Sequence, residues 1–279
     1  MTHTTGPVGI VAGYGELPIV LAAAVENAGR GLVVIALSGE TSPDIETPGR
    51  KVLWHQVGQF QTIVDELKGA GISDLLMAGK IDHISHMGSK HINGRLSEIL
   101  ADLDDLRGST VLRGLTDAFE KEGFFLAETT RFVPDLLPEV GLLTEEQPSK
   151  AQMKDVAFGW RIAKEMARLD IGQTVIVKDL SVISVEAVEG TDNAICRAGG
   201  LAGEGIVAVK VSADDHDFRF DVPTVGTKTI QAMAEAGGKL LAVEAGKCIL
   251  LNREEILRLC RENGVVLVSA DEDFLGDLL

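Results

Sequence analysis

Four aspartates gather in one short stretch of the second half of the chain, which reads DDHDFRFDVPTVG. Asp214, Asp215, Asp217 and Asp221 fall within eight residues, and Arg219 stands between the last two. Carboxylates of this kind can bind Mg²⁺ or accept a proton from water. In an extended strand Asp217 and Asp221 would share one side and lie roughly 13 Å apart at a rise of ~3.3 Å per residue. They could not then ligate one Mg²⁺ together, and a charged edge strand is the alternative interpretation.

A second acidic group occurs in the segment VEAVEGTDNAICR. Glu186, Glu189 and Asp192 stand at the end of a predicted strand, and Thr191 is a candidate helix N-cap. Asp192 would then lie in the first helical turn, where a carboxylate complements the helix dipole. The pattern fits either a site for a ligand or an ordinary helix start.

The glycine-rich segment VGIVAGYGELP lies close to the N-terminus. Gly13 and Gly15 fit the first two positions of the dinucleotide-binding pattern G-x-G-x-x-G, but the third position is Pro18, which suits the first turn of a helix. The segment predicts either a loop that binds a phosphate or a tight turn between strand and helix. Lys80, directly after another predicted strand, is either a ligand contact or a solvated lysine.

Strand and helix signals alternate through the first half of the chain. This alternation indicates a parallel sheet that is covered by helices on both faces. The strands are predicted at residues 8–12, 32–37 and 72–80, and the helices at 18–29, 60–71, 94–106 and 110–121.

The composition changes over residues 133–149, which hold three of the eight prolines and show little periodicity. We interpret this segment as a linker. It would separate a Rossmann-like N-terminal domain with a parallel sheet, residues 6–132, from a C-terminal α/β domain, residues 150–279, that carries the acidic cluster. Strands of the second half come as closer pairs, which favours a mixed sheet there.

Charge and cysteine usage limit the classes of function. A formal net charge of −16 argues against general nucleic-acid binding and against attraction to an anionic membrane surface. The three cysteines, Cys196, Cys248 and Cys260, form no CxxC pair, which indicates reduced thiols in a cytosolic protein. The N-terminus has no pattern of a signal peptide.

Six segments together resemble one known family. In chain order they read GIVAGYGELP, DLLMAGK, LDIGQTVIVKD, VEAVEGTD, VAVKV and DFRFDVPTVG. Along nearly its whole length the chain is similar to the LpxI-type UDP-2,3-diacylglucosamine pyrophosphatases. The resemblance implies hydrolysis of UDP-2,3-diacylglucosamine, with Mg²⁺, to UMP and 2,3-diacylglucosamine 1-phosphate (lipid X) in lipid A biosynthesis. It also implies two domains with the ligand between them, and a cytoplasmic protein that touches the inner membrane transiently.

The resemblance and the chemistry of the residues together suggest individual roles. We expect Asp221 to be the central catalytic carboxylate, as metal ligand or general base, with Asp217 in support. Arg219 or Arg197 would stabilise the charge of the phosphates. The other expected metal ligands are Asp192 and Glu189. The expected substrate-binding residues are Gly13, Gly15, Lys80, Thr191 and Arg197. Two other functions stay open, a nicotinamide-dependent oxidoreductase and a non-catalytic nucleotide-binding protein, and so does a homodimer.

Overall fold

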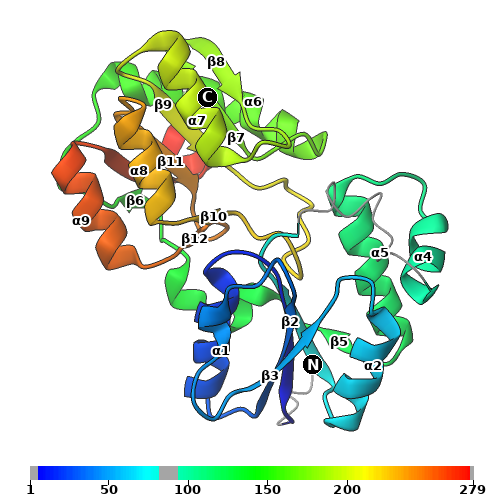
Figure 1. Ribbon diagram of the computed structural model, residues 1–279. Coiled ribbons are helices and arrows are strands. Elements are labelled where there is room, and N and C mark those ends of the chain that lie inside the picture. Colours follow the sequence, from blue (N-terminus) through cyan, green and yellow to red (C-terminus); the bar gives the residue numbers. More distant parts are fainter. Residues whose placement is uncertain (1–5, 82–93, 277–279) are drawn as a thin grey trace. The chain divides into compact units, whose positions relative to one another are not determined.

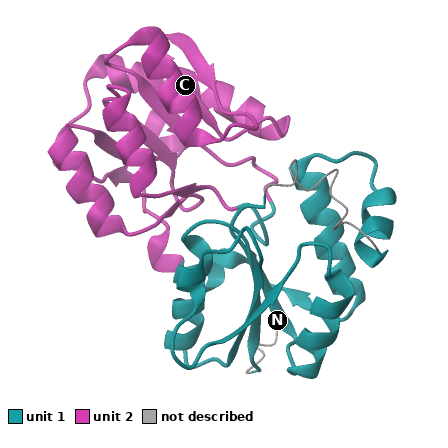
Figure 2. Ribbon diagram, viewed as in Figure 1, with its two compact units in different colours: residues 1–133, 217–221 teal, residues 134–216, 222–279 magenta. Residues whose placement is uncertain are grey.

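The structure is a computed structural model that describes residues 6–81 and 94–276. The chain forms two compact units (Figure 2), and each is described by itself. Unit 1 comprises residues 1–133 and 217–221, and unit 2 comprises residues 134–216 and 222–279. The main chain therefore passes from one unit to the other three times.

Unit 1 is built on a five-stranded parallel sheet with the order β3-β2-β1-β4-β5. Its strands are β1 (Val8–Ala12), β2 (Leu32–Leu37), β3 (Lys51–His55), β4 (Asp74–Ala78) and β5 (Phe125–Leu126). Its helices are α1 (Leu17–Asn27), α2 (Phe60–Gly69), α4 (Gly94–Ala101) and α5 (Gly108–Lys121), with the 3-10 turns η1 (Pro43–Ile45) and η2 (Thr129–Phe132). This confirms the parallel sheet predicted from the alternating pattern.

The strands β1, β2 and β4 at the centre of this sheet are largely buried on both faces, whereas the edge strand β3 is mostly half-buried or exposed. Successive strand residues point to opposite sides of the sheet, so both faces of these strands are apolar. Val33 and Ile35 of β2 pack in one cluster with apolar residues of α2, α4 and α5. Helix α1 packs against β1, β2 and β4, and its Leu21 and Val25 are fully buried. Figure 1 shows α1 on one side of this sheet and α2, α4 and α5 on the other. The sequences of β1, β2 and β4 are therefore nearly continuous apolar runs, without alternation of apolar and polar residues.

Unit 2 contains a six-stranded mixed sheet with the order β6-β13-β11-β9-β7-β8. Strands β9, β11 and β13 are parallel, whereas β7 and β8 form an antiparallel hairpin and β6 pairs antiparallel with β13. The six strands are β6 (Gly141–Leu142), β7 (Thr174–Lys178), β8 (Ser181–Val185), β9 (Val207–Lys210), β11 (Leu240–Glu244) and β13 (Val266–Ala270). The predicted mixed sheet is thus confirmed.

Helices cover both faces of this second sheet. Helices α7 (Thr191–Ala202), α8 (Thr227–Glu235) and α9 (Arg253–Asn263) cover one face, and α6 (Lys150–Arg168) and α10 (Glu272–Leu275) cover the other. Helix α6 starts at a capping box, in which Ser149 accepts a hydrogen bond from the Gln152 amide and Gln152 binds back. The short strands β10 (Thr224–Val225) and β12 (Ile249–Leu250) pair beside this sheet, and η3 (Pro134–Leu136) opens the unit.

The segment predicted as a linker, residues 133–149, is tied to unit 2 in the structure. It contributes β6, where Leu142 pairs with Val268, and the carbonyl of Pro138 accepts a hydrogen bond from the Gly246 amide. Proline cannot donate, but its carbonyl still accepts, so a proline-rich segment can be held without periodic apolar residues.

The aspartate segment 217–221 packs with unit 1, although the residues on both sides of it in the sequence belong to unit 2. These five residues belong to unit 1, because Phe220 is buried among apolar side chains of that unit.

Candidate active site

Residues 217–221 form a tight turn in unit 1, so the predicted extended strand is wrong. The Asp217 carbonyl accepts a hydrogen bond from the Phe220 amide at 3.2 Å, and its side chain accepts one from the Arg219 amide at 3.1 Å. Asp and Asn often close turns through such local bonds to the backbone. Within the turn, Phe220 is buried whereas Phe218 is only half-buried.

Asp221 lies directly after this turn and has an unusual backbone. Its φ angle is 52°, in the left-handed region that costs an ordinary L-residue roughly 1–2 kcal/mol. Its side chain is exposed. Backbone strain of this kind is common where a side chain must be held in one direction. The structure therefore presents the Asp221 carboxylate on a fixed corner of unit 1.

Arg219 is occupied by two carboxylates. Its Nη2 atom lies 2.6 Å from Asp217 Oδ2, and its Nη1 atom lies 2.6 Å from Glu120 Oε1 on α5. The hydrogen bond from Arg219 holds the pKa of Asp217 below its usual value. The same bond, chiefly, raises the pKa of Arg219. Both groups therefore stay charged at neutral pH, and the guanidinium is already neutralised. No local pattern in the sequence predicts the role of Glu120, because it lies 99 residues from Arg219.

The segment after β8 holds a buried ion pair in unit 2. Lys210, at the end of β9, donates to Thr191 Oγ1 at 2.7 Å and lies 3.8 Å from Glu186 Oε2. The Thr191 hydroxyl donates in turn to Glu186 Oε1 at 2.8 Å. The prediction that Thr191 caps α7 is wrong: Gly190, with a φ of 82°, takes that position, and the Thr191 side chain is turned to the buried pair instead.

The other polar residues around the start of α7 are partnered. Arg197 donates to Glu189 Oε1 at 2.6 Å. A hydrogen bond from the backbone of Glu189 itself, and then the one from Arg197, hold the pKa of Glu189 below its usual range. Asp192 accepts a hydrogen bond from the Thr229 hydroxyl of α8 at 2.8 Å. Arg197 is thus tied to the loop before α7.

The three predicted metal ligands are divided between the two units. Asp221 belongs to unit 1, whereas Glu189 and Asp192 belong to unit 2 and already have partners. Across residues 6–81 and 94–276, no group of three or more His, Cys, Asp or Glu side chains is placed to hold a metal ion. Because Mg²⁺ in phosphate-binding enzymes commonly uses one or two carboxylates with substrate phosphates, a single carboxylate such as Asp221 fits that arrangement better than a protein cage.

The glycine loop after β1 lies against the segment after β4 in unit 1. Tyr14 and Lys80 form an antiparallel bridge, with amide–carbonyl distances of 2.7 and 2.9 Å. A Cβ atom on Gly13 would collide with the Lys80 carbonyl oxygen, and Gly15 has a φ of 108°. Both glycines are therefore required by the turn itself. The Lys80 side chain is exposed at the carboxyl end of β4, beside the point where the strand order reverses, and this is where ligands of open α/β sheets bind.

Substitution at Gly13 should be costly for stability. Gly13→Ala is expected to lower the free energy of unfolding by about 1–3 kcal/mol, the usual cost of overpacking, because the Lys80 backbone must move. Gly69→Ala is the matched control, since a Cβ atom there meets nothing within 4 Å and Ala favours the helix. Urea denaturation measures both, and equal midpoints for the two variants would show that the close approach costs nothing.

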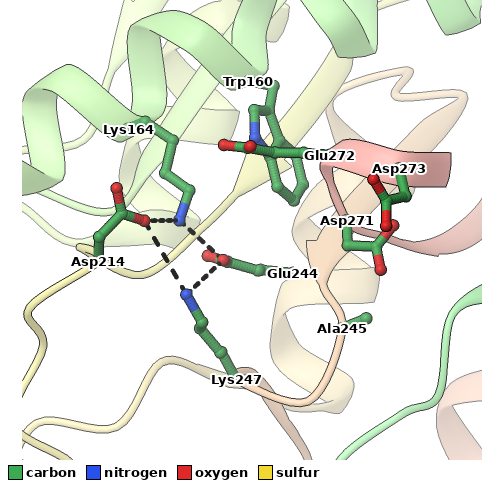
Figure 3. A pocket seen from close by; sticks show the side chains of 9 residues that line it. All are labelled: Trp160, Lys164, Asp214, Glu244, Ala245, Lys247, Asp271, Glu272 and Asp273. Carbon is green, nitrogen blue, oxygen red and sulfur yellow. Dashed lines mark hydrogen bonds and ion pairs between the residues drawn. The ribbon is translucent and has the colours of Figure 1, made fainter. Parts of the chain in front are cut away.

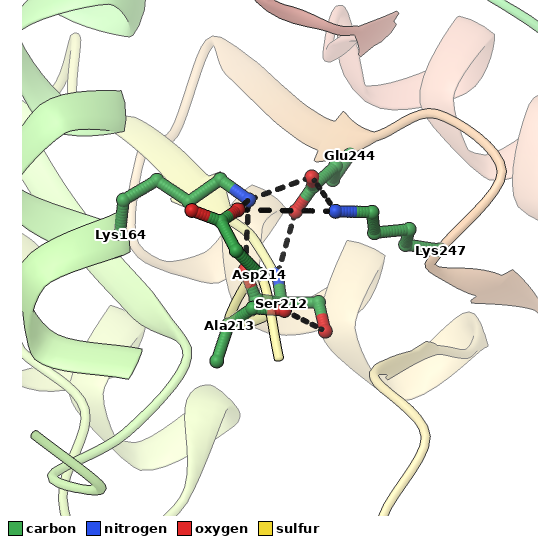
Figure 4. A network of polar contacts seen from close by, with 6 residues as sticks. All are labelled: Lys164, Ser212, Ala213, Asp214, Glu244 and Lys247. Atoms are coloured by element: carbon green, nitrogen blue, oxygen red, sulfur yellow. Dashed lines mark hydrogen bonds and ion pairs between the residues drawn. The ribbon is translucent and has the colours of Figure 1, made fainter. Parts of the chain in front are cut away.

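Sequence reasoning missed a polar network at the carboxyl ends of β9 and β11. Lys164 of α6 donates to Asp214 at 2.8 Å, to Glu244 at 2.7 Å and to the Ser212 carbonyl at 2.9 Å, and Lys247 lies 2.8 Å from Glu244 (Figure 4). Burial lowers the pKa of Lys164, but its bonds to the two carboxylates outweigh this and raise it overall. The only signal in the sequence is a charged residue at the end of an apolar strand, LLAVE.

This network borders a hollow of ≈ 450 Å³ in unit 2 (Figure 3). Five of its nine lining residues are acidic and two are lysines, Lys164 and Lys247, which are both already paired with Glu244. A surplus of carboxylates repels a bare diphosphate. The hollow is therefore better suited to donor groups, such as hydroxyls, than to phosphate.

The family models and a relative of similar sequence point to one family. The LpxI N-terminal domain model matches residues 7–136, and the LpxI C-terminal domain model matches residues 139–268. UDP-2,3-diacylglucosamine pyrophosphatase LpxI of Caulobacter vibrioides is 30% identical over 280 residues, which cover 94% of this chain and 97% of that protein. A solved structure of a proposed epimerase from Burkholderia cenocepacia J2315 covers 98% of this chain and 97% of its own at 12% identity, but its TM-score of 0.27 carries no argument.

Proposed function

The chain belongs to the LpxI family, and on that premise we propose that it hydrolyses UDP-2,3-diacylglucosamine to UMP and 2,3-diacylglucosamine 1-phosphate in lipid A biosynthesis. The observation that carries this proposal is the match of both family domains together with a relative of that name over 94% of the chain. In this reaction the oxygen of water bonds to one phosphorus of the diphosphate. The bond from that phosphorus to the bridging oxygen breaks, and the proton of the water passes to a base.

Asp221 is our proposed base or metal ligand. Its carboxylate is exposed on a fixed backbone corner, whereas the neighbouring Asp217 is bound to Arg219 on both oxygens. A carboxylate that already accepts two charge-assisted bonds has a lowered pKa and is a weak base. Asp217 therefore supports the turn, and we assign the chemistry to the exposed carboxylate of Asp221.

Mg²⁺ is our proposed cofactor. The substrate's diphosphate is anionic and the chain carries a net charge of −16, so a cation is needed to bring the two together. When bound, Mg²⁺ would polarise the phosphates and neutralise charge that develops during the reaction. We propose that it is held by Asp221 together with the substrate's own phosphate oxygens.

The direct test is release of UMP from UDP-2,3-diacylglucosamine in detergent micelles. We expect UMP to form with Mg²⁺ and to fall to background after treatment with EDTA, and to return when Mg²⁺ is added in excess. A folded preparation that releases no UMP under these conditions would contradict the proposed function. Full activity in EDTA would remove the cation from the mechanism but leave the hydrolysis standing.

We further propose that the protein is cytoplasmic and meets its substrate at the inner face of the inner membrane. The relative's name specifies a substrate with two acyl chains, which partition into a bilayer. Within the described residues, no helix is both long and apolar enough to cross a membrane. Sedimentation with vesicles that contain the substrate tests the contact, and substrate-free vesicles are the control.

A further inference from the structure

The turn of residues 217–221 is anchored to unit 1 by side-chain packing and by the backbone. Phe220 is 4% exposed and packs in the same cluster as Phe119 of α5. The Thr129 amide, at the start of η2, donates to the Phe218 carbonyl at 3.1 Å. Two independent contacts therefore fix a segment that is short, polar and remote in sequence from the rest of the unit.

The charges around Arg219 show what this guanidinium can and cannot do. Nε and Nη2 donate to both oxygens of Asp217, and Nη1 donates to Glu120. Two carboxylates therefore already surround this guanidinium, and the charge of Arg113 also acts on Asp217. A phosphate would have to displace one of them, so the arrangement favours Arg219 as a clamp between the turn and α5 over Arg219 as a phosphate ligand.

The ion pair of Arg219 with Glu120 lies two residues away from the left-handed backbone of Asp221. A left-handed conformation of a non-glycine residue persists where the surrounding structure over-determines it. Two contacts hold the backbone here. The Phe220 side chain is buried, and the preceding residue, Arg219, makes an ion pair with Glu120. Loosening either would let the Asp221 carboxylate move.

We propose that Glu120 and Arg219 are positioning residues, which hold the turn on α5 so that the Asp221 carboxylate is presented in one direction. This inference rests on the proposed function, because it assigns to Asp221 the chemistry described there. It replaces the expectation from the sequence that Arg219 stabilises phosphate charge directly.

The experiment is a double-mutant cycle on UMP release. Glu120→Gln and Arg219→Gln are each expected to lower kcat about ten- to hundredfold, the scale of a misplaced catalytic group, with KM within about threefold of the wild type. In an Asp221→Asn background the same changes should lower kcat by less than about twofold, since a positioning residue has no effect once the group it positions is disabled. If the effects of the two substitutions on kcat multiply in full in the combined variant, the proposal is overturned. A rise in KM with no change in kcat would overturn it as well.

Glu122→Gln is the matched control. Glu122 lies two residues from Glu120, at the end of the same helix, and pairs with Lys68 at 2.6 Å on the surface. Its loss should leave kcat and KM unchanged. If Arg219→Gln fails to fold, the cycle is carried out with Glu120→Gln and Asp221→Asn. Glu120→Gln is expected to fold, because it changes only a half-exposed carboxylate.

Hydrogen exchange gives a readout that does not depend on turnover. The Phe220 amide, bonded to the Asp217 carbonyl, should exchange faster in Glu120→Gln than in the wild type and in Glu122→Gln. Unchanged exchange would overturn the proposed clamp. A wild type that releases no UMP contradicts the proposed function instead, and the two failures are thereby distinguished.

Discussion

Asp221→Asn is expected to lower kcat for UMP release by at least about a hundredfold, the lower range for loss of a general base or of a key electrostatic group. The amide keeps the size of the carboxylate but has no charge and cannot accept a proton from water. KM should stay within a few-fold, so the variant should retain uncleaved substrate. Single-turnover release of UMP at saturating Mg²⁺ measures the chemical step directly.

Asn is a better replacement than Ala at this position because of the backbone. Asp221 has a φ of 52°, and Asn adopts the left-handed region more readily than Ala does. Asp221→Ala would therefore mix a loss of charge with a loss of stability. Asp217→Ala is not a neutral comparison either, since it removes the partner of Arg219.

Asp170→Asn supplies the matched control for Asp221→Asn. Asp170 is also exposed, and its φ of 56° is nearly the same, but it lies at the end of α6 in unit 2. The same chemical change on the same backbone should leave turnover and thermal melting as in the wild type. If Asp221→Asn also turns over normally, Asp221 is structural and the base must be sought at Asp192 or Glu189.

The sheets could be predicted from the sequence because their signal is local. Runs such as LVVIAL and DLLMA are long enough to identify a buried strand, and segments with helical spacing occur between such runs. The hairpin of β7 and β8 is likewise indicated by two adjacent strand-like runs in the sequence. Fold class follows from such patterns without any knowledge of which strands are neighbours.

The turn of residues 217–221 could not be predicted in the same way. The alternation of Phe218 and Phe220 with charged residues imitates a strand, and nothing local shows that Phe220 is buried in unit 1 while its neighbours in sequence belong to unit 2. The decisive contact, Arg219 with Glu120, joins residues 99 positions apart. Site residues are therefore recognised by type from the sequence, but their roles depend on long-range pairing.

Lys210→Met is expected to destabilise unit 2 by about 3–5 kcal/mol, because it leaves the Glu186 carboxylate buried without its cation. Lys210 is 4% exposed and Glu186 is 7% exposed, so water cannot replace the lost partner. Removing both charges, in Lys210→Met with Glu186→Gln, should restore most of the stability, since the amide can still accept from Thr191. Urea denaturation measures the change through the fluorescence of Trp160, which is 2% exposed in unit 2, in a Trp54→Phe background that removes the tryptophan of unit 1.

Lys68→Met is the comparison for this last effect, because Lys68 makes an ion pair of ordinary length with Glu122, but its side chain is 46% exposed. An exposed pair contributes about 0–1 kcal/mol, so this variant should melt close to the wild type. If Lys210→Met also melts close to the wild type, the Glu186 carboxylate gains a proton or water when its partner is lost, and the pair does not fix the start of α7. If instead the double variant is as unstable as Lys210→Met, the cost lies in the packing of the lysine stem and not in the uncompensated charge.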